Sequence, residues 1–185
     1  PIQVYPQTTA GFLDPGDGCH PYAVNFANTS ANANSYQWNF GNGIVSVAQN
    51  PSTTFLNPTM ADSTYTVSLI AVSPNGCSDT TSLDVIVHPV PVAQFSLSNE
   101  EGCHPSPTEI TNNSSLATSY EWDYGDGFAS LTDELLHTHI FSSTSASPVT
   151  YFVSLTAITP FGCTDTYELP YTVYPLISAD FEFGD

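Results

Sequence analysis

The sequence predicts an all-β fold built from two tandem immunoglobulin-like sandwiches of about seven strands each. Three observations predict it. Apolar and polar residues alternate over several short segments, Gly-, Pro- and Asn-rich turns separate these segments, and the whole pattern occurs twice within 185 residues. This length fits two domains, since domains of about 100 residues are common.

Strands are expected where apolar residues recur at every second position. No segment has the spacing of an amphipathic helix. In the first unit the clearest strands are residues 24–26, 36–40, 65–72 and 83–87. The turns between strands are marked by residues 14–18, 41–43 and 74–76, and in the second unit by 125–127 and 160–162.

The repeat is visible as landmarks that return in the same order. Residues 18–21 (Gly-Cys-His-Pro) return at 102–105 and residues 36–43 at 120–127, both 84 residues later. Residues 65–69 return at 151–155 and residues 76–80 at 162–166, now 86 residues later. We therefore expect a two-residue insertion between Gly127 and Phe141, and otherwise equivalent units.

The repeat also predicts the domain boundaries. Residues 8–90 form the first domain and residues 91–176 the second. Residues 1–7 resemble the end of a unit and residues 177–185 the start of one, so these flanks are expected to belong to a preceding and a following repeat. Pro89 and Pro91 at the join favour a stiff, extended connection.

The charge is one-sided, with 18 acidic residues and neither Lys nor Arg. Such a chain cannot neutralise phosphates, so nucleic acids and anionic membrane surfaces are excluded as partners. Schiff-base lysines and arginine clamps are excluded as well. No apolar run is long enough to cross a membrane as a helix. The sequence therefore excludes many enzyme classes and predicts no membrane insertion and a surface kept soluble by negative charge.

The hairpin sequence Trp122-Asp123-Tyr124-Gly125-Asp126-Gly127, with the Tyr-x-Val-x-Leu strand at 151–155, resembles the polycystic kidney disease (PKD) domain. The first unit departs from this pattern at Asn39 and Asn42, where the family usually has Asp. The Gly-Cys elements resemble a cysteine-bearing subtype of secreted, repeat-built bacterial surface proteins. This resemblance implies an extracellular stalk or adhesin without catalytic activity.

Trp38 and Trp122 occupy the same position in the two units. An exposed Trp is a platform for a sugar ring, but Tyr36 and Phe40 lie on the same strand face as Trp38. We therefore interpret both tryptophans as core residues.

Several polar residues are candidates for a divalent cation, with Ca²⁺ as the candidate ion. Asp123 and Asp126, with Asp14 and Asp17 in the first unit, offer carboxylate oxygens in tight turns. The alternative, which we favour, is that these side chains cap the turns by accepting backbone N–H groups. His137 and His139 are spaced to share one strand face, where a metal-binding and a packing role are both considered; packing is favoured.

Cys19, Cys77, Cys103 and Cys163 form two equivalent pairs and lack the spacing of a zinc site. They predict disulfides and an oxidising, extracellular location. Two connectivities remain open. In the first, each unit has its own disulfide, Cys19–Cys77 and Cys103–Cys163. In the second, Cys19 bonds Cys163 between the units, and Cys77 and Cys103 bond cysteines of neighbouring repeats. In a sandwich the two cysteines of one unit lie at opposite ends, some 20 Å apart, which favours the second.

Candidate glycosylation sites are Asn28, Asn112 and Asn113 in Asn-x-Ser/Thr sequences, with Ser63 and Thr80 for O-linked sugars. Together these observations predict a non-catalytic repeat segment of an extracellular filament or adhesin stalk. Its expected partners are neighbouring repeats, other copies in a filament and, as a candidate, surface polysaccharide. The alternative is a carbohydrate- or calcium-binding accessory module of a secreted polysaccharide- or protein-degrading enzyme.

Overall fold

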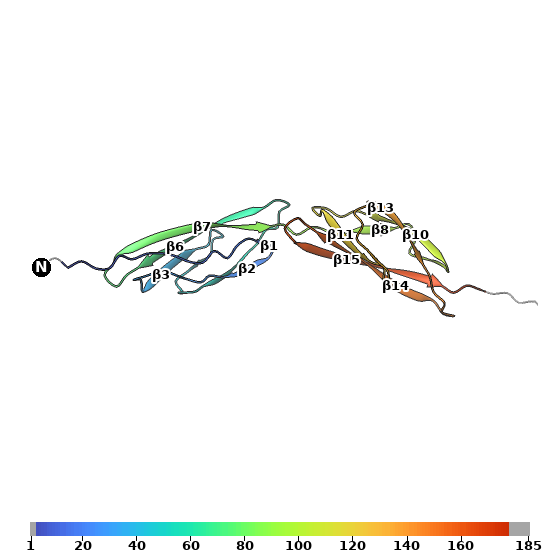
Figure 1. The fold of residues 1–185 in the computed structure, drawn as a ribbon, viewed down its shortest axis with the longest axis horizontal. Coiled ribbons are helices and arrows are strands. Elements are labelled where there is room, and N and C mark those ends of the chain that lie inside the picture. The colour runs from blue at the N-terminus through green and yellow to red at the C-terminus, as the bar shows by residue number, and fades with distance from the viewer. Residues whose placement is uncertain (1–2, 178–185) are drawn as a thin grey trace, which may run out of the picture. The chain divides into compact units, whose positions relative to one another are not determined.

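The computed structural model describes residues 3–177, and in this range the regular elements are all β-strands (Figure 1). The all-β prediction is therefore confirmed. The chain divides into two compact units, Pro1–Pro89 and Val90–Asp185. The expected start of a following repeat lies almost wholly outside the described residues, since only residue 177 of it is described.

Unit 1 consists of seven strands in two sheets. The larger sheet has the order β1-β7-β6-β3-β4, and β2 pairs with β5 in the smaller sheet. The bounds are β1 (Gly18–Cys19), β2 (Tyr22–Asn25), β3 (Ser35–Asn39), β4 (Val45–Ser46), β5 (Ser52–Phe55), β6 (Ser63–Val72) and β7 (Ser78–His88).

Unit 2 repeats this arrangement with one additional strand. Its five-stranded sheet has the order β12-β11-β14-β15-β9, and its second sheet the order β13-β10-β8. The bounds are β8 (Phe95–Leu97), β9 (Glu101–Cys103), β10 (Ser106–Asn112), β11 (Ser119–Asp123), β12 (Ala129–Ser130), β13 (Leu136–Phe141), β14 (Val149–Ile158) and β15 (Thr164–Tyr174).

Each unit contains one parallel strand pair among otherwise antiparallel pairs. β1 runs parallel to β7 and β9 runs parallel to β15. The Gly-Cys segment thus lies along the C-terminal part of the last strand, with Cys19 opposite His88 and Cys103 opposite Tyr174. Glycine is required before each cysteine, because a Cβ at Gly18 or Gly102 would overlap a neighbouring side chain.

A tryptophan lies at the centre of each core. Trp38 on β3 and Trp122 on β11 each have 1% of their surface exposed, so both lie in the core. Trp38 contacts Phe12 and Phe26 of the facing layer, with ring centroids 5.1 and 5.5 Å apart. Trp122 contacts Phe95 at 5.2 Å. Aromatic rings in these geometries bury large apolar areas and hold the two layers together.

A second shared feature is a tyrosine that ties the edge of each core to a loop. Tyr151 stacks on Phe141 at 5.7 Å and donates its hydroxyl to the Ser142 carbonyl at 2.7 Å. Tyr65 packs on Phe55 at 4.9 Å and makes the equivalent bond to a loop carbonyl. In each unit the apolar ring is thus packed against another ring, and the hydroxyl has a hydrogen-bond acceptor.

The hairpin glycines provide a test of this packing. Gly125 has φ +72°, and a Cβ there would lie 2.6 Å from the Phe152 carbonyl oxygen. Gly127 has φ +93° but open space around it. Gly125→Ala should therefore destabilise unit 2 by ~2–3 kcal/mol, and Gly127→Ala by only ~1 kcal/mol. Hydrogen exchange measured by mass spectrometry reads unit 2 separately; equal effects of the two substitutions would contradict this packing.

Candidate functional site

The acidic hairpin of unit 2 is a pair of hydrogen-bonded turns. An Asp123 carboxylate oxygen accepts the Gly125 N–H at 2.8 Å, and an Asp126 oxygen accepts the Phe128 N–H at 3.1 Å. In unit 1, Asn39 and Asn42 use their amide oxygens for the same two bonds, at 2.9 and 3.0 Å. The carboxyl and the amide are thus interchangeable here, as expected for turn-capping side chains.

Asp14 and Asp17, the two candidate ligands of unit 1, also accept backbone N–H groups. Asp14 accepts the Gly16 N–H at 2.8 Å, and Asp17 accepts the Ile86 N–H of β7 at 3.1 Å. Among residues 3–177, no group of three or more His, Cys, Asp or Glu side chains has an arrangement that could hold a metal ion. The Asp14 bond supports the turn-capping interpretation, whereas Asp17 ties its turn to β7. Ca²⁺ binding stays a prediction.

The turn-capping interpretation predicts different effects of two substitutions at Asp123. Asp123→Asn should leave the free energy of unfolding nearly unchanged, because the amide oxygen accepts the same N–H. Asp123→Ala should cost ~1 kcal/mol, the contribution of one hydrogen bond. Urea unfolding with and without millimolar Ca²⁺ measures both. A Ca²⁺-dependent stabilisation that Asp123→Asn abolishes would favour a cation site instead.

Two histidines of β13 point toward the core of unit 2 and make polar contacts. His139 lies 2.8 Å from an Asp126 carboxylate oxygen, and its ring stacks on Tyr124 with centroids 3.9 Å apart. His137 lies 3.0 Å from the Tyr124 hydroxyl, and its ring contacts Trp122 at 4.8 Å. The predicted packing role is therefore the one this geometry supports. Unit 1 has an amide–hydroxyl contact between Asn42 and Thr53 at the position of the Asp–His pair.

Burial shifts the pKa of two members of this cluster, His137 and Tyr124. Desolvation lowers the pKa of His137, opposed by the charge of Glu134 and assisted by His139. Desolvation also raises the pKa of Tyr124, as does the charge of Asp126. His137 is therefore held in its neutral form more strongly than in the unfolded chain.

The lowered pKa of His137 predicts how the free energy of unfolding changes with pH. Above pH 6.5 the group is neutral in both states. As the pH falls below this value, the unfolded chain takes up a proton that the folded chain resists, so the free energy of unfolding decreases. The slope is at most ~1.4 kcal/mol per pH unit. Urea unfolding at pH 7.5 and 5.0 should show a smaller decrease for His137→Gln than for the wild type; equal decreases would contradict the assignment.

The cysteines differ in oxidation state. Cys19 and Cys163 are disulfide-bonded, whereas Cys77 and Cys103 are exposed free thiols. Neither of the bonds Cys19–Cys77 and Cys103–Cys163 is therefore formed.

The last strand of each unit explains this result. Cys19 lies opposite His88, at one end of β7, and Cys77 directly precedes Ser78, at the other end. Ten residue steps separate His88 from Ser78, about 33 Å along a strand. A disulfide needs Cα atoms within about 7 Å. In unit 2, Cys103 lies opposite Tyr174 and Cys163 precedes Thr164, so the same separation applies.

Several side chains with structural roles were not recognised from the sequence. The His20 and His104 rings each accept a backbone N–H from the loop after β5 or β13, at 2.8 and 3.1 Å. Asp79 and Asp165 each accept an N–H from the segment that opens their unit, both at 2.8 Å. The sequence signal that could have identified these four residues is that each His and each Asp occurs at the equivalent position of both repeats.

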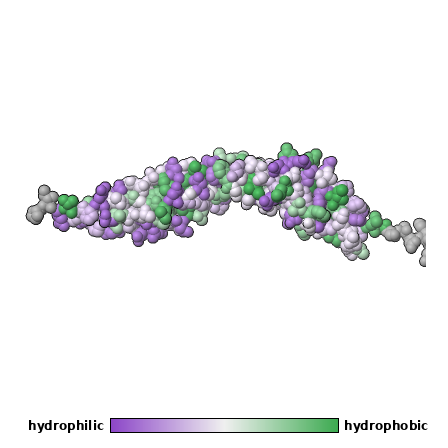
Figure 2. Space-filling view, viewed as in Figure 1, coloured by the Kyte–Doolittle hydropathy of each residue, from purple (hydrophilic) through white to green (hydrophobic). Residues whose placement is uncertain are grey.

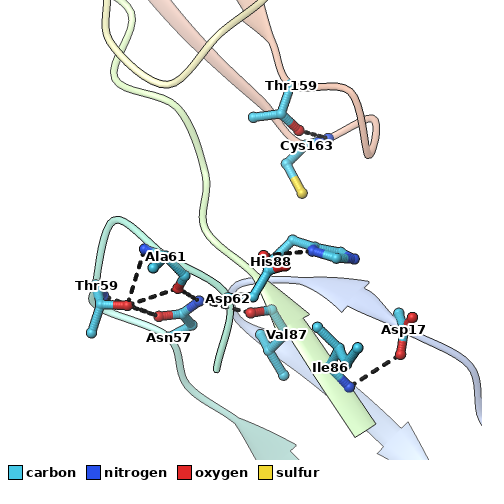
Figure 3. A network of polar contacts seen from close by, with 10 residues as sticks. All are labelled: Asp17, Asn57, Thr59, Ala61, Asp62, Ile86, Val87, His88, Thr159 and Cys163. Atoms are coloured by element: carbon cyan, nitrogen blue, oxygen red, sulfur yellow. Dashed lines mark hydrogen bonds and ion pairs between the residues drawn. The ribbon is translucent and has the colours of Figure 1, made fainter. Parts of the chain in front are cut away.

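A polar network secures the end of β7 (Figure 3). The Asn57 amide donates to the carbonyls of Val87 and Ala61, at 2.7 and 2.8 Å. His88 lies 2.8 Å from an Asp62 carboxylate oxygen. The strand that carries the Cys19 pairing is thereby fixed at its last residues.

A groove lies at the open edge of the larger sheet in each unit, and equivalent strands line the two grooves. The groove of unit 1 has a volume of about 440 Å³ and that of unit 2 about 450 Å³. Glu121 and Asp123 line the second groove, while Val45, Val47 and Ile70 line the first. Figure 2 shows the hydrophobic residues of the visible face as separate patches among hydrophilic ones. Trp122 and Trp38 lie beneath these two grooves, but only 1% of the surface of each is exposed.

The candidate glycosylation sites differ in accessibility. The side-chain nitrogens of Asn28 and Asn112, where a sugar would attach, are buried in the folded units. This burial argues against their modification after folding. Asn113 and Thr80 are exposed and Ser63 is half-buried, so modification of these three stays a prediction.

The described part of the chain contains no helix long and apolar enough to cross a membrane.

Similar proteins were found among solved structures only. No protein-family model and no curated protein matches the chain. The PKD1 domain of the Vibrio cholerae metalloprotease PrtV is 29% identical over 46% of this chain and 98% of that domain, with a TM-score of 0.37. The PKD1 domain of Vibrio anguillarum Epp is 26% identical over 47% and 96%, with a TM-score of 0.37. Fibronectin(III)-like modules of Clostridium thermocellum CbhA are 12% identical over 94% and 100%, with a TM-score of 0.43.

Proposed function

We propose that this chain is a non-catalytic structural segment of an extracellular filament or adhesin, made of two PKD-like units that carry length and mechanical load. One observation carries this proposal: a complete sandwich core is built twice from equivalent residues. In both units the central tryptophan is buried. In both, a tyrosine ties the core to a loop. A duplicated module whose aromatic residues are buried in its own core is suited to act as a spacer between other parts of a protein.

The surface supports the same role. With 18 acidic residues and no basic ones, copies of the chain repel one another and stay soluble. The absence of Lys and Arg also leaves no cleavage point for trypsin-like proteases. The disulfide state of Cys19 and Cys163 supports an oxidising, extracellular location.

We further propose that Cys19 and Cys163 bond each other. They are the two oxidised cysteines of a chain whose other two cysteines are free thiols. Their partners within the same unit are excluded by the length of the last strand. Such a bond would join the two units covalently, so that a pulling force on the chain would pass through it.

Single-molecule pulling on the two chain ends tests this function. In the oxidised chain the 144 residue steps from Cys19 to Cys163 (163 − 19) should not unravel, because the disulfide bypasses them. After reduction they should extend in two resisted events of similar size, with a combined contour of roughly 500 Å. Cys19→Ser, pulled under oxidising conditions, should behave as the reduced wild type.

Two outcomes would count against the proposal. Full extension of the oxidised wild type would reject the Cys19–Cys163 bond. Extension of the reduced chain without resistance would reject the load-bearing role. In the second case the accessory-module alternative would be favoured by binding of a glycan in the groove lined by Glu121 and Asp123.

A further inference from the structure

Each free thiol has an equivalent cysteine in the other unit, and that equivalent cysteine is disulfide-bonded. Cys77 precedes β7 as Cys163 precedes β15, and we call these two the turn-type cysteines. Cys103 pairs with the end of β15 as Cys19 pairs with the end of β7, and we call these two the strand-type cysteines. One cysteine of each type is disulfide-bonded and one is an exposed thiol.

The two turn-type cysteines have the same backbone environment. The Ser73 N–H donates to the Cys77 carbonyl at 2.8 Å, and the Thr159 N–H donates to the Cys163 carbonyl at 2.9 Å. The hydroxyls of Ser73 and Thr159 accept the N–H of the same two cysteines at 3.0 and 3.1 Å. The free thiol of Cys77 therefore lies on a turn with the same hydrogen bonds as the turn that carries the oxidised Cys163.

The two strand-type cysteines are equivalent as well. Cys19 lies opposite His88 and Cys103 opposite Tyr174, both in parallel pairing. The N–H of the residue that follows each cysteine donates to the carbonyl of this strand partner at 3.0 Å in both units. Cys103 is thus held at the strand end in the backbone geometry of the oxidised Cys19.

Cys77 and Cys103 can form disulfides only with cysteines from outside their own units. Within unit 1 the strand-type cysteine lies at the far end of β7 from Cys77, and within unit 2 the turn-type cysteine lies at the far end of β15 from Cys103. Both of those cysteines are already oxidised. A further disulfide must therefore use a cysteine of another unit.

We propose that each free thiol is one half of a junction, in which a strand-type cysteine bonds a turn-type cysteine of a further unit of this repeat. Between two copies of this chain, the bond joins Cys103 of one copy to Cys77 of the other. The proposal rests on the proposed tandem function, because it extends the Cys19–Cys163 bond to successive junctions. The result is a chain of units with one disulfide at every junction.

The reaction balances with a disulfide oxidant such as oxidised glutathione. The Cys103 thiolate attacks the oxidant, forms a mixed disulfide and releases one glutathione thiol. The Cys77 thiolate of the second copy then attacks the mixed disulfide and releases the other glutathione. The two cysteines together lose two electrons and two protons, and the oxidant becomes two thiols.

Two complementary variants test the proposal. Cys77→Ser retains only the strand-type thiol and Cys103→Ser only the turn-type thiol. Each variant is incubated with oxidised glutathione alone and as an equimolar mixture, and products are resolved by non-reducing electrophoresis and peptide mapping. About 0.5 M salt shortens the Debye length to a few ångströms, which suppresses repulsion between copies that each carry a formal charge of −18. The double variant is the matched control and should stay monomeric.

The proposal predicts that the mixture forms a Cys103–Cys77 heterodimer in at least ~10-fold excess over either homodimer, because docking raises the effective concentration of the matched thiols. The wild type should form a ladder of multimers that reduction dissolves. Homodimers at the statistical ratio, or thiols that end only as glutathione adducts, would overturn the proposal.

The same peptide map separates this proposal from the proposed function. A wild-type monomer that lacks the Cys19–Cys163 peptide would reject the inter-unit bond and, with it, the junction proposal, whereas the load-bearing role is tested separately by pulling on the reduced chain. A monomer that contains this peptide but forms no heterodimer in the mixture would reject the junction proposal alone.

Discussion

The structure depends on one constraint in each unit, which is the enclosure of a tryptophan between two sheets. Trp38 and Trp122 lie on an inner strand of the larger sheet and contact phenylalanines of the facing layer. The hairpin that follows each tryptophan must turn tightly, and Asx side chains cap it in both units. The aromatic surface that a sugar-binding module would expose is thereby used inside the protein.

The last strand of each unit sets the distance between the two cysteines of that unit. β7 and β15 each have 11 residues and run the length of their unit, so a cysteine paired with the end of the strand and one preceding its start cannot meet. Cys19 and Cys163 are disulfide-bonded, whereas Cys77 and Cys103 are free thiols. The strand length therefore excludes a disulfide between the two cysteines of one unit.

The alternating strands, the turn glycines and the buried tryptophans could be predicted because each depends on local sequence and on the repeat. The parallel pairing of β1 with β7 could not, since it joins segments nearly 70 residues apart and leaves no periodic signal. The Asp126–His139 contact was missed for a related reason, because it appears in only one repeat. The burial of the Asn112 amide nitrogen likewise depends on packing that a three-residue motif does not encode.

Quenching of tryptophan fluorescence by acrylamide tests the central claim most directly. Both tryptophans have 1% of their surface exposed, so the native chain should show blue-shifted emission and quenching several-fold weaker than the urea-unfolded chain. Added oligosaccharides should leave both quantities unchanged. Native emission quenched as strongly as in urea, or protected by a glycan, would show a tryptophan at the surface and would contradict the account.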